Sequence, residues 1–167
     1  MKAQVRILVV VMLLIGVPAG LVAQRVTSAS AKPVLFVCEH GTVRSLLARV
    51  LFEQYAAEVG LARTAVSRGT RADSVVPPWM LKGLATDHVE LGTWRPQTLQ
   101  PRDLMDASLV VSFDVPTAAT AIATVPRAQW DSLPSVSRDY ATGRDAIRIR
   151  VHHLVDSLKM AERRGAP

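Results

Sequence analysis

Cysteine is the scarcest reactive residue of this 167-residue chain, with a single copy, Cys38. One cysteine excludes an intramolecular disulfide and any zinc site built from several thiolates. No cysteine stands directly after the apolar N-terminal run, which excludes a lipoprotein anchor. Aromatic residues make up only 5%, and no run of Lys and Arg is interleaved with them. We therefore predict no nucleic-acid partner, no metal and no other cofactor. The net charge of +6 fits either a generally basic surface or attraction for anionic substrates.

The N-terminus has the pattern of a secretory signal. Lys2 and Arg6 precede an apolar run over residues 7–17, which Pro18 and small residues follow. We predict a signal peptide at 1–23, with cleavage as late as residue 31 also open, a linker at 24–32 and one folded domain at 33–165. The protein is then exported, either periplasmic or secreted, with no stable membrane insertion. The alternative is an uncleaved anchor, although a bilayer span takes about 20 apolar residues.

Short apolar runs alternate with longer amphipathic stretches after residue 32. We predict strands at 34–37, 65–67, 108–113 and 128–130, and helices at 45–58, 77–87, 117–124 and 143–163. The last helix is expected to be capped by Thr142, with Asp145 completing a capping box. Its core stripe is expected at Ile147, Val151, Leu154 and Leu158. Strands that alternate with helices predict an α/β domain with a parallel sheet.

The stretch that carries chemistry lies between the first predicted strand and the first predicted helix. It consists of Cys38, five residues, Arg44 and Ser45. Ligands of open α/β sheets bind beyond the carboxyl ends of the strands, where the next helix points free N–H groups at the loop. A loop of this length wraps a tetrahedral oxyanion with successive amides. The predicted oxyanion-binding residues are Glu39, His40, Gly41, Thr42, Val43, Arg44 and Ser45.

Each side chain of this loop has a predicted task. The groups that bind an oxyanion also stabilise a thiolate, so Cys38 is predicted to attack phosphorus and form a thiophosphate intermediate. Arg44 presents a planar fork that matches two oxyanion oxygens. The Ser45 hydroxyl can donate to the Cys38 thiolate, and Gly41 permits a positive φ. The alternative is an inert cysteine at the end of a core strand.

This loop resembles that of the low-molecular-weight protein tyrosine phosphatase and arsenate reductase superfamily. The resemblance extends to Ser67-Arg68-Gly69-Thr70, Arg95-Pro96-Gln97 and Trp130, and covers roughly residues 32–163. It implies a three-layer α/β fold with a four-stranded parallel sheet flanked by helices. It also implies Cys38 as the nucleophile and Arg44 as the oxyanion clamp.

Two departures from the family pattern bear on mechanism. His40 and Gly41 stand where the family has Gly and Asn, so His40 either meets the substrate or thiolate or is a rim residue without a role. Leu133-Pro134 stands where the family has an acidic Asp before Pro, and Leu cannot protonate a leaving group. Asp131 and Asp139 are nearby, and Asp131, the closer, is the candidate general acid. Each is alternatively a solvated loop carboxylate.

The resemblance implies a phosphatase that hydrolyses phosphotyrosine or similar aryl phosphate monoesters through a cysteinyl-phosphate. The expected partner is a phosphorylated protein, a small aryl phosphate or a free oxyanion. One alternative is an arsenate reductase that uses an external thiol, because no second cysteine can relay oxidation. Another is an oxyanion-binding protein with weak or no catalysis. His152 and His153 form no expected metal site, since adjacent residues of a helix face different sides.

Overall fold

The computed structural model describes residues 31–121 and 124–165. The predicted signal peptide lies outside the described residues, as does most of the predicted linker. In the two described ranges, no helix is both long and apolar enough to cross a membrane. The elements are β1 (Val34–Cys38), α1 (Arg44–Val59), β2 (Ala65–Gly69), α2 (Pro78–Thr86), α3 (Pro101–Asp106), β3 (Leu109–Ser112), the 3-10 helix η1 (Thr117–Thr120), β4 (Arg127–Gln129) and α4 (Tyr140–Gly165).

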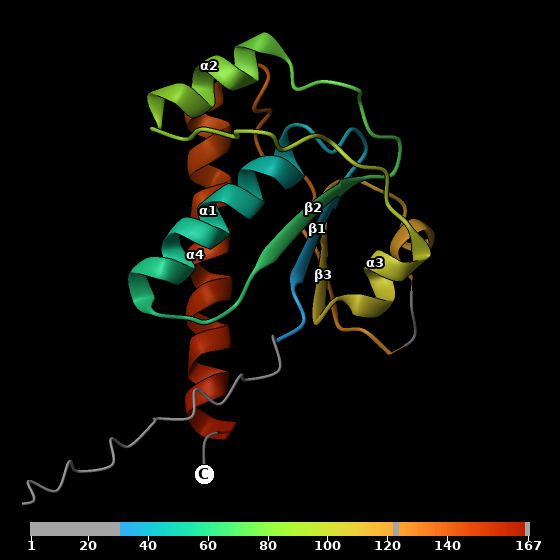
Figure 1. Ribbon diagram of the computed structural model, residues 1–167, viewed down its shortest axis with the longest axis vertical. Coiled ribbons are helices and arrows are strands. Elements are labelled where there is room, and N and C mark those ends of the chain that lie inside the picture. Colours follow the sequence, from blue (N-terminus) through green and yellow to red (C-terminus); the bar gives the residue numbers. More distant parts are fainter. Residues whose placement is uncertain (1–30, 122–123, 166–167) are drawn as a thin grey trace, which may run out of the picture.

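The four strands form one parallel sheet in the order β2-β1-β3-β4 (Figure 1). Cys38 at the end of β1 lies opposite Gly69 of β2, and Val37 lies opposite Ser112 of β3. The chain moves from β1 to one neighbour, β2, and then crosses to the other, β3, so the strand order reverses beside β1. Open α/β sheets bind ligands at such a reversal. The four-stranded parallel α/β fold implied by the resemblance is confirmed.

The sheet is covered on both faces, which explains the uninterrupted apolar sequence of β1. Val34, Phe36 and Cys38 pack into the larger core cluster with α1, α2 and α4. Leu35 and Val37 point the other way, into a smaller cluster with α3. Figure 1 shows α1 and α4 on one side of the sheet and α3 on the other. A strand buried on both faces has no polar alternation, as in other parallel sheets.

The larger cluster is organised around aromatic side chains. Phe36 lies 5.9 Å from Phe52 and 6.1 Å from Trp130, measured between ring centroids, and Phe113 meets Trp130 edge-on at 5.6 Å. These edge and tilted arrangements are the favoured geometries of aromatic pairs. Trp130 is therefore a core residue that ties the segment after β4 to the central strand.

Helix α4 begins three residues earlier than predicted, and its cap differs. Asp139 accepts hydrogen bonds from the Thr142 amide at 3.1 Å and the Thr142 hydroxyl at 2.7 Å. The prediction that Thr142 caps the helix is thus wrong, because Asp139 offers a stronger acceptor three residues earlier. The fully buried residues of the stripe are Ile147, Val151 and Val155, whereas Leu154 and Leu158 are only partly buried.

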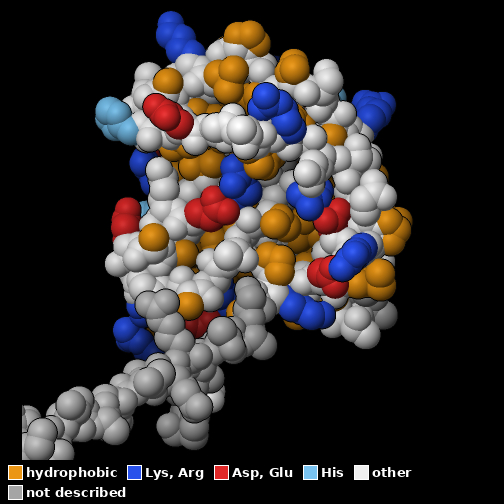
Figure 2. Space-filling model, viewed as in Figure 1, with side chains coloured by type: hydrophobic (Ala, Val, Ile, Leu, Met, Phe, Trp, Pro, Cys, Tyr) orange, Lys and Arg blue, Asp and Glu red, His pale blue; other side chains and the backbone are white. Residues whose placement is uncertain are grey.

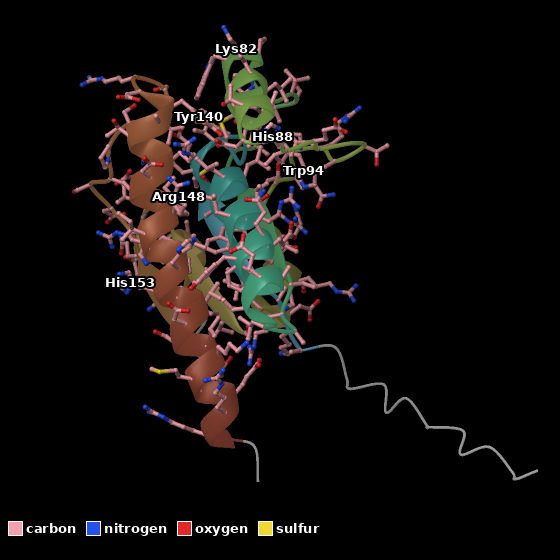
Figure 3. All side chains as sticks on the ribbon, turned by 90° about the vertical axis from the view of Figure 1, so that its left-hand side faces the viewer. Lys82, His88, Trp94, Tyr140, Arg148 and His153 are labelled. Atoms are coloured by element: carbon pink, nitrogen blue, oxygen red, sulfur yellow. The ribbon has the colours of Figure 1, made fainter. Side chains whose placement is uncertain are left out.

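Helix α2 is fastened to the start of α4 through Tyr140, which lies between the two helices (Figure 3). A Cβ added at Gly83 would lie 2.3 Å from the Tyr140 ring, so glycine makes room for this ring. The Tyr140 hydroxyl donates to Asp87 Oδ2 at 2.7 Å. Burial, together with this carboxylate, raises the pKa of Tyr140 above its ordinary value of 10.0.

Helix α3 was not predicted from the sequence. It begins with Pro101 at its first turn and has a capping box in which Gln100 and Asp103 each bond the other's backbone. The Gln100 amide donates to Asp103 Oδ2 at 2.8 Å. Proline followed two residues later by an acidic residue was the available signal.

Charged side chains of both signs share the face seen in Figure 2. Basic side chains lie apart from one another there and are mixed with acidic ones. Arg68 pairs with Asp103 at 2.9 Å and Arg102 with Asp106 at 3.1 Å. The net positive charge is therefore not gathered into one basic strip on the face viewed.

Candidate active site

The cysteine lies at the carboxyl end of β1, where the chain turns into α1. The Gly41 amide donates to Cys38 Sγ at 3.2 Å, and Ser45 Oγ lies 3.1 Å from the same sulfur. Cys38 is buried, and among the described residues no side chain caps the amino end of α1. The free N–H groups and the dipole of α1 therefore face the loop that follows the sulfur. These groups can bind an anion in the space beside Cys38 Sγ.

The loop is held from outside by the segment that follows β2. Thr70, Arg71 and Asp73 donate their amides to the carbonyls of the three residues 38, 39 and 40, at 3.0, 2.8 and 3.0 Å. In a trans peptide the N–H points opposite to the preceding C=O, and none of the described peptides is cis. The amides of residues 39, 40 and 41 therefore point inward, as the Gly41 bond to sulfur shows for the last of them.

Glycines at positions 41 and 69 allow the backbones of these two loops to approach each other closely. Gly41 has a φ of +72°, and a Cβ there would lie 2.8 Å from the Gly69 nitrogen. A Cβ at Gly69 would meet Gly41 N, His40 C and Ala72 Cα, each at 2.8 Å. Glycine at 41 thus meets the need for both a left-handed conformation and a close backbone approach.

Arg44 begins α1 and is held by a residue that sequence reasoning missed. Its guanidinium forms an ion pair with Asp114, which directly follows Phe113 beyond the end of β3. The other oxygen of Asp114 accepts the Ser132 amide at 3.2 Å. The position of Asp114 in the sequence could have indicated this role. A carboxylate just after a strand that neighbours β1 lies at the same edge of the sheet as the loop.

A cavity of about 410 Å³ opens above the sulfur. Its walls combine apolar groups with three carboxylates. The lining residues are Cys38, Glu39, His40, Thr42, Val43, Arg44, Asp73, Pro77, Phe113, Asp114, Ser135, Val136 and Ser137. Six of the eight predicted site residues from 38 to 45 line it, and the other two, Gly41 and Ser45, contact the sulfur from within the loop. A cavity of this size, with a sulfur and an arginine on its floor, suits a small oxyanion carrying an organic group.

The carboxylate predicted as the general acid does not line this cavity. Asp131 Oδ1 accepts the Asp114 amide at 2.8 Å, and its Oδ2 accepts the Gln129 side-chain amide at 2.6 Å. The hydrogen bonds of Asp139 to Thr142 serve the start of α4 and lower the pKa of Asp139 below its usual range. Residues 135–137 reach the cavity from this loop instead, and they offer only hydroxyls and a valine.

His40 stands at the rim with a carboxylate partner. Its Nδ1 lies 3.0 Å from Asp73 Oδ1, and Thr42 Oγ1 donates to Asp73 Oδ2 at 2.9 Å. Glu39 Oε2 lies 3.6 Å from His40 Nε2, beyond hydrogen-bond distance, and Glu39 also pairs with Arg71. The structure thus joins His40 to the segment after β2, an association that the sequence did not predict.

A sequence model of low molecular weight phosphotyrosine protein phosphatases matches residues 33–157. The chain belongs to this family. The resemblance seen in the sequence is therefore confirmed over residues 33–157, from the residue before β1 into α4. Comparison with curated proteins gives no match.

Solved structures of similar fold include phosphatases and reductases. An arginine phosphatase from Geobacillus stearothermophilus has a TM-score of 0.68 and 17% identity, covering 81% of this chain and 98% of that one. A low molecular weight protein tyrosine phosphatase from Bacillus subtilis has a TM-score of 0.64 and 22% identity, covering 77% and 97%. A thioredoxin-dependent arsenate reductase from Corynebacterium glutamicum has a TM-score of 0.68 and 20% identity, covering 80% of this chain and 65% of the reductase. At these identities the likeness concerns the fold.

His40 and Leu133, at the two positions where the sequence is expected to depart from the family pattern, lie in the cysteine loop and directly before Pro134. His152 stacks on Tyr55 with ring centroids 3.8 Å apart, whereas His153 lies on the outer side of α4 (Figure 3). These two histidines therefore do not converge on one point, and neither lines the cavity.

Proposed function

We propose that this protein is a phosphatase that hydrolyses phosphotyrosine or similar aryl phosphate monoesters through a cysteinyl-phosphate. The observation that carries the proposal is the pair of contacts to Cys38 Sγ, from the Gly41 amide at 3.2 Å and Ser45 Oγ at 3.1 Å, at the floor of a cavity that Arg44 also lines. A sulfur in this setting lies beside the place where an oxyanion would bind, so it is placed to attack the bound phosphorus.

The reaction has two steps. The Cys38 thiolate attacks phosphorus in line, forming an S–P bond while the P–O bond to the aryl group breaks and its electron pair leaves with the oxygen, which takes up a proton. Water then attacks the phosphorus, loses a proton, and the S–P bond breaks to return the thiolate and release phosphate. Arg44 and the inward amides stabilise the charge on the equatorial oxygens in both steps. The Ser45 hydroxyl stabilises the sulfur as it leaves in the second step.

The shape of the cavity favours an aryl ester. Pro77, Phe113 and Val136 give its wall an apolar side, while the oxyanion site lies deep beside Cys38. A flat ring would pack against this wall and place its phosphate at the floor. Aryl oxides are also better leaving groups than alkoxides, which reduces the demand on a proton donor.

The test is hydrolysis of p-nitrophenyl phosphate at mildly acidic pH by the wild-type chain and by Cys38→Ser. We expect slow turnover by the wild type, trapping of a phosphorylated cysteine upon rapid quenching, and no turnover by the variant. Absence of turnover together with micromolar binding of phosphate or vanadate would refute the phosphatase and support an oxyanion-binding protein. Arsenate loss that depends on added thiol, without ester hydrolysis, would support the reductase.

A further inference from the structure

A proton must reach the leaving oxygen, and the cavity offers few groups to deliver it. Its ionisable lining residues other than Cys38 and Arg44 are Glu39, His40, Asp73 and Asp114. Asp114 is bound through one oxygen to Arg44 and through the other to the Ser132 amide. A carboxylate that accepts on both oxygens, once from a guanidinium, is placed to orient Arg44 rather than to give up a proton.

Both carboxylate oxygens of Asp73 also have partners, and one of these partners is the His40 ring. Its two oxygens accept from Thr42 Oγ1 at 2.9 Å and meet His40 Nδ1 at 3.0 Å. The Asp73 amide also donates to the His40 carbonyl at 3.0 Å, so backbone and side chain hold the two residues together. Thr42 is fully buried, which fixes one side of the carboxylate.

Among the described residues, this arrangement leaves the second ring nitrogen of His40 without a hydrogen bond. With Nδ1 bound to Asp73, Nε2 is the remaining nitrogen, and Glu39 Oε2 lies 3.6 Å from it. The His40 side chain is about half exposed, at 51%, and the residue lines the cavity that holds Cys38. A carboxylate on one nitrogen that orients the ring for proton transfer at the other is a recurring catalytic arrangement.

We propose that His40, oriented by Asp73, is the general acid and base of this phosphatase, in place of the family's absent Asp before Pro134. His40 Nε2–H gives its proton to the aryl oxygen as the P–O bond breaks. The neutral Nε2 then takes a proton from water as its oxygen bonds to phosphorus and the S–P bond breaks. The two transfers balance, so His40 ends the cycle protonated. This assignment rests on the proposed function.

The test compares two substrates that differ in how much they need an acid. Phenyl phosphate releases a phenolate about as basic as a tyrosine side chain, with a pKa of about 10, whereas p-nitrophenyl phosphate releases a far weaker base. We expect His40→Asn to lower kcat/KM for phenyl phosphate by about 10²-fold or more, and to change that for p-nitrophenyl phosphate much less. Asparagine keeps a side-chain N–H for Asp73, and an unchanged vanadate affinity would show that the loop is intact.

Asp73→Asn and Asp131→Asn complete the experiment. Asp73→Asn should give a smaller loss of the same selective kind, and the double variant with His40→Asn should lose little more than His40→Asn alone, because the pair acts as a unit. Asp131→Asn should keep the wild-type ratio of the two kcat/KM values. Equal losses on both substrates in His40→Asn, or a selective loss in Asp131→Asn, would overturn the assignment while leaving the phosphatase standing. A wild-type chain that hydrolyses neither ester would overturn both.

Discussion

Gly41 gives the sharpest test of how the loop is built, because the chain offers a matched control for it. Gly41→Ala places a side chain at a φ of +72°, and the new Cβ would lie 2.8 Å from Gly69 N and 3.1 Å from Gly69 Cα. Gly92 also has a positive φ, +54°, but nothing lies within 4 Å of a Cβ there. Gly92→Ala therefore carries only the conformational cost, about 1–2 kcal/mol.

The additional cost at Gly41 comes from contact with backbone, which cannot swing aside as a flexible side chain would. Overpacking of this kind costs about 1–3 kcal/mol, so Gly41→Ala should lower the free energy of unfolding by about 2–5 kcal/mol in total. If the loop yields instead, the Gly41 amide moves away from Cys38 Sγ. A displacement of about 1 Å at a reacting group can cost roughly 10²-fold in rate.

The assay is urea unfolding of both variants beside kcat/KM for p-nitrophenyl phosphate. We expect Gly92→Ala to lose modest stability and keep its activity. We expect Gly41→Ala to lose more stability and about 10²-fold in kcat/KM. Equal stability losses and full activity in Gly41→Ala would refute the reasoning, since the close contact with Gly69 would then have no consequence.

Three further predictions concern the surroundings of the site. Asp114→Asn removes the charged partner of Arg44 and should lower kcat/KM roughly tenfold, a loss of about 1.4 kcal/mol that matches one charge-assisted hydrogen bond; steady-state kinetics that match the wild type would contradict this. Gly143→Ala puts a Cβ 2.7 Å from Val136 Cα, and this overpacking should lower the free energy of unfolding in urea by about 1–3 kcal/mol. Because Val136 lines the cavity, its displacement should also raise KM. An unchanged KM would show that Val136 is not held by this contact. The raised pKa of Tyr140 means that its contribution is complete below pH 10 and is lost as the pH rises further; Tyr140→Phe should cost about 1 kcal/mol at pH 7 and flatten the alkaline fall in stability, and an identical alkaline profile would contradict it.

Much of the site was predictable because it is local in the sequence. Cys38, Arg44 and Ser45 belong to one loop, and the apolar run before it placed that loop at the end of a buried strand. Asp114 and Asp73 were not predicted, because each follows a different strand and reaches the loop only through the order β2-β1-β3. A side-chain pattern does not indicate which strands neighbour β1. The sequence therefore does not predict that these two carboxylates contact Arg44 and His40.

The direction of a loop side chain is a second property that the sequence does not give. Nearness to Pro134 along the chain makes Asp131 the predicted general acid, and in the structure its carboxylate accepts from the Asp114 amide and the Gln129 side chain. The direction of a loop side chain depends on which backbone amides lie unpaired beside it. Helix α4 is a similar case, since Asp139 and Thr142 are both good caps by type, and in the structure Asp139 accepts hydrogen bonds from the amide and the hydroxyl of Thr142.

The most direct test of the account is alkylation of Cys38 by iodoacetamide at neutral pH, measured with and without an oxyanion in the wild-type chain and in Ser45→Ala. We expect phosphate or vanadate to slow the wild-type reaction, because the oxyanion would bind the loop amides beside the sulfur. We expect Ser45→Ala to react more slowly than the wild type, because the hydroxyl 3.1 Å from Cys38 Sγ is removed. Equal rates in the two proteins, without protection by oxyanions, would contradict the claim that this loop binds an oxyanion beside a reactive sulfur.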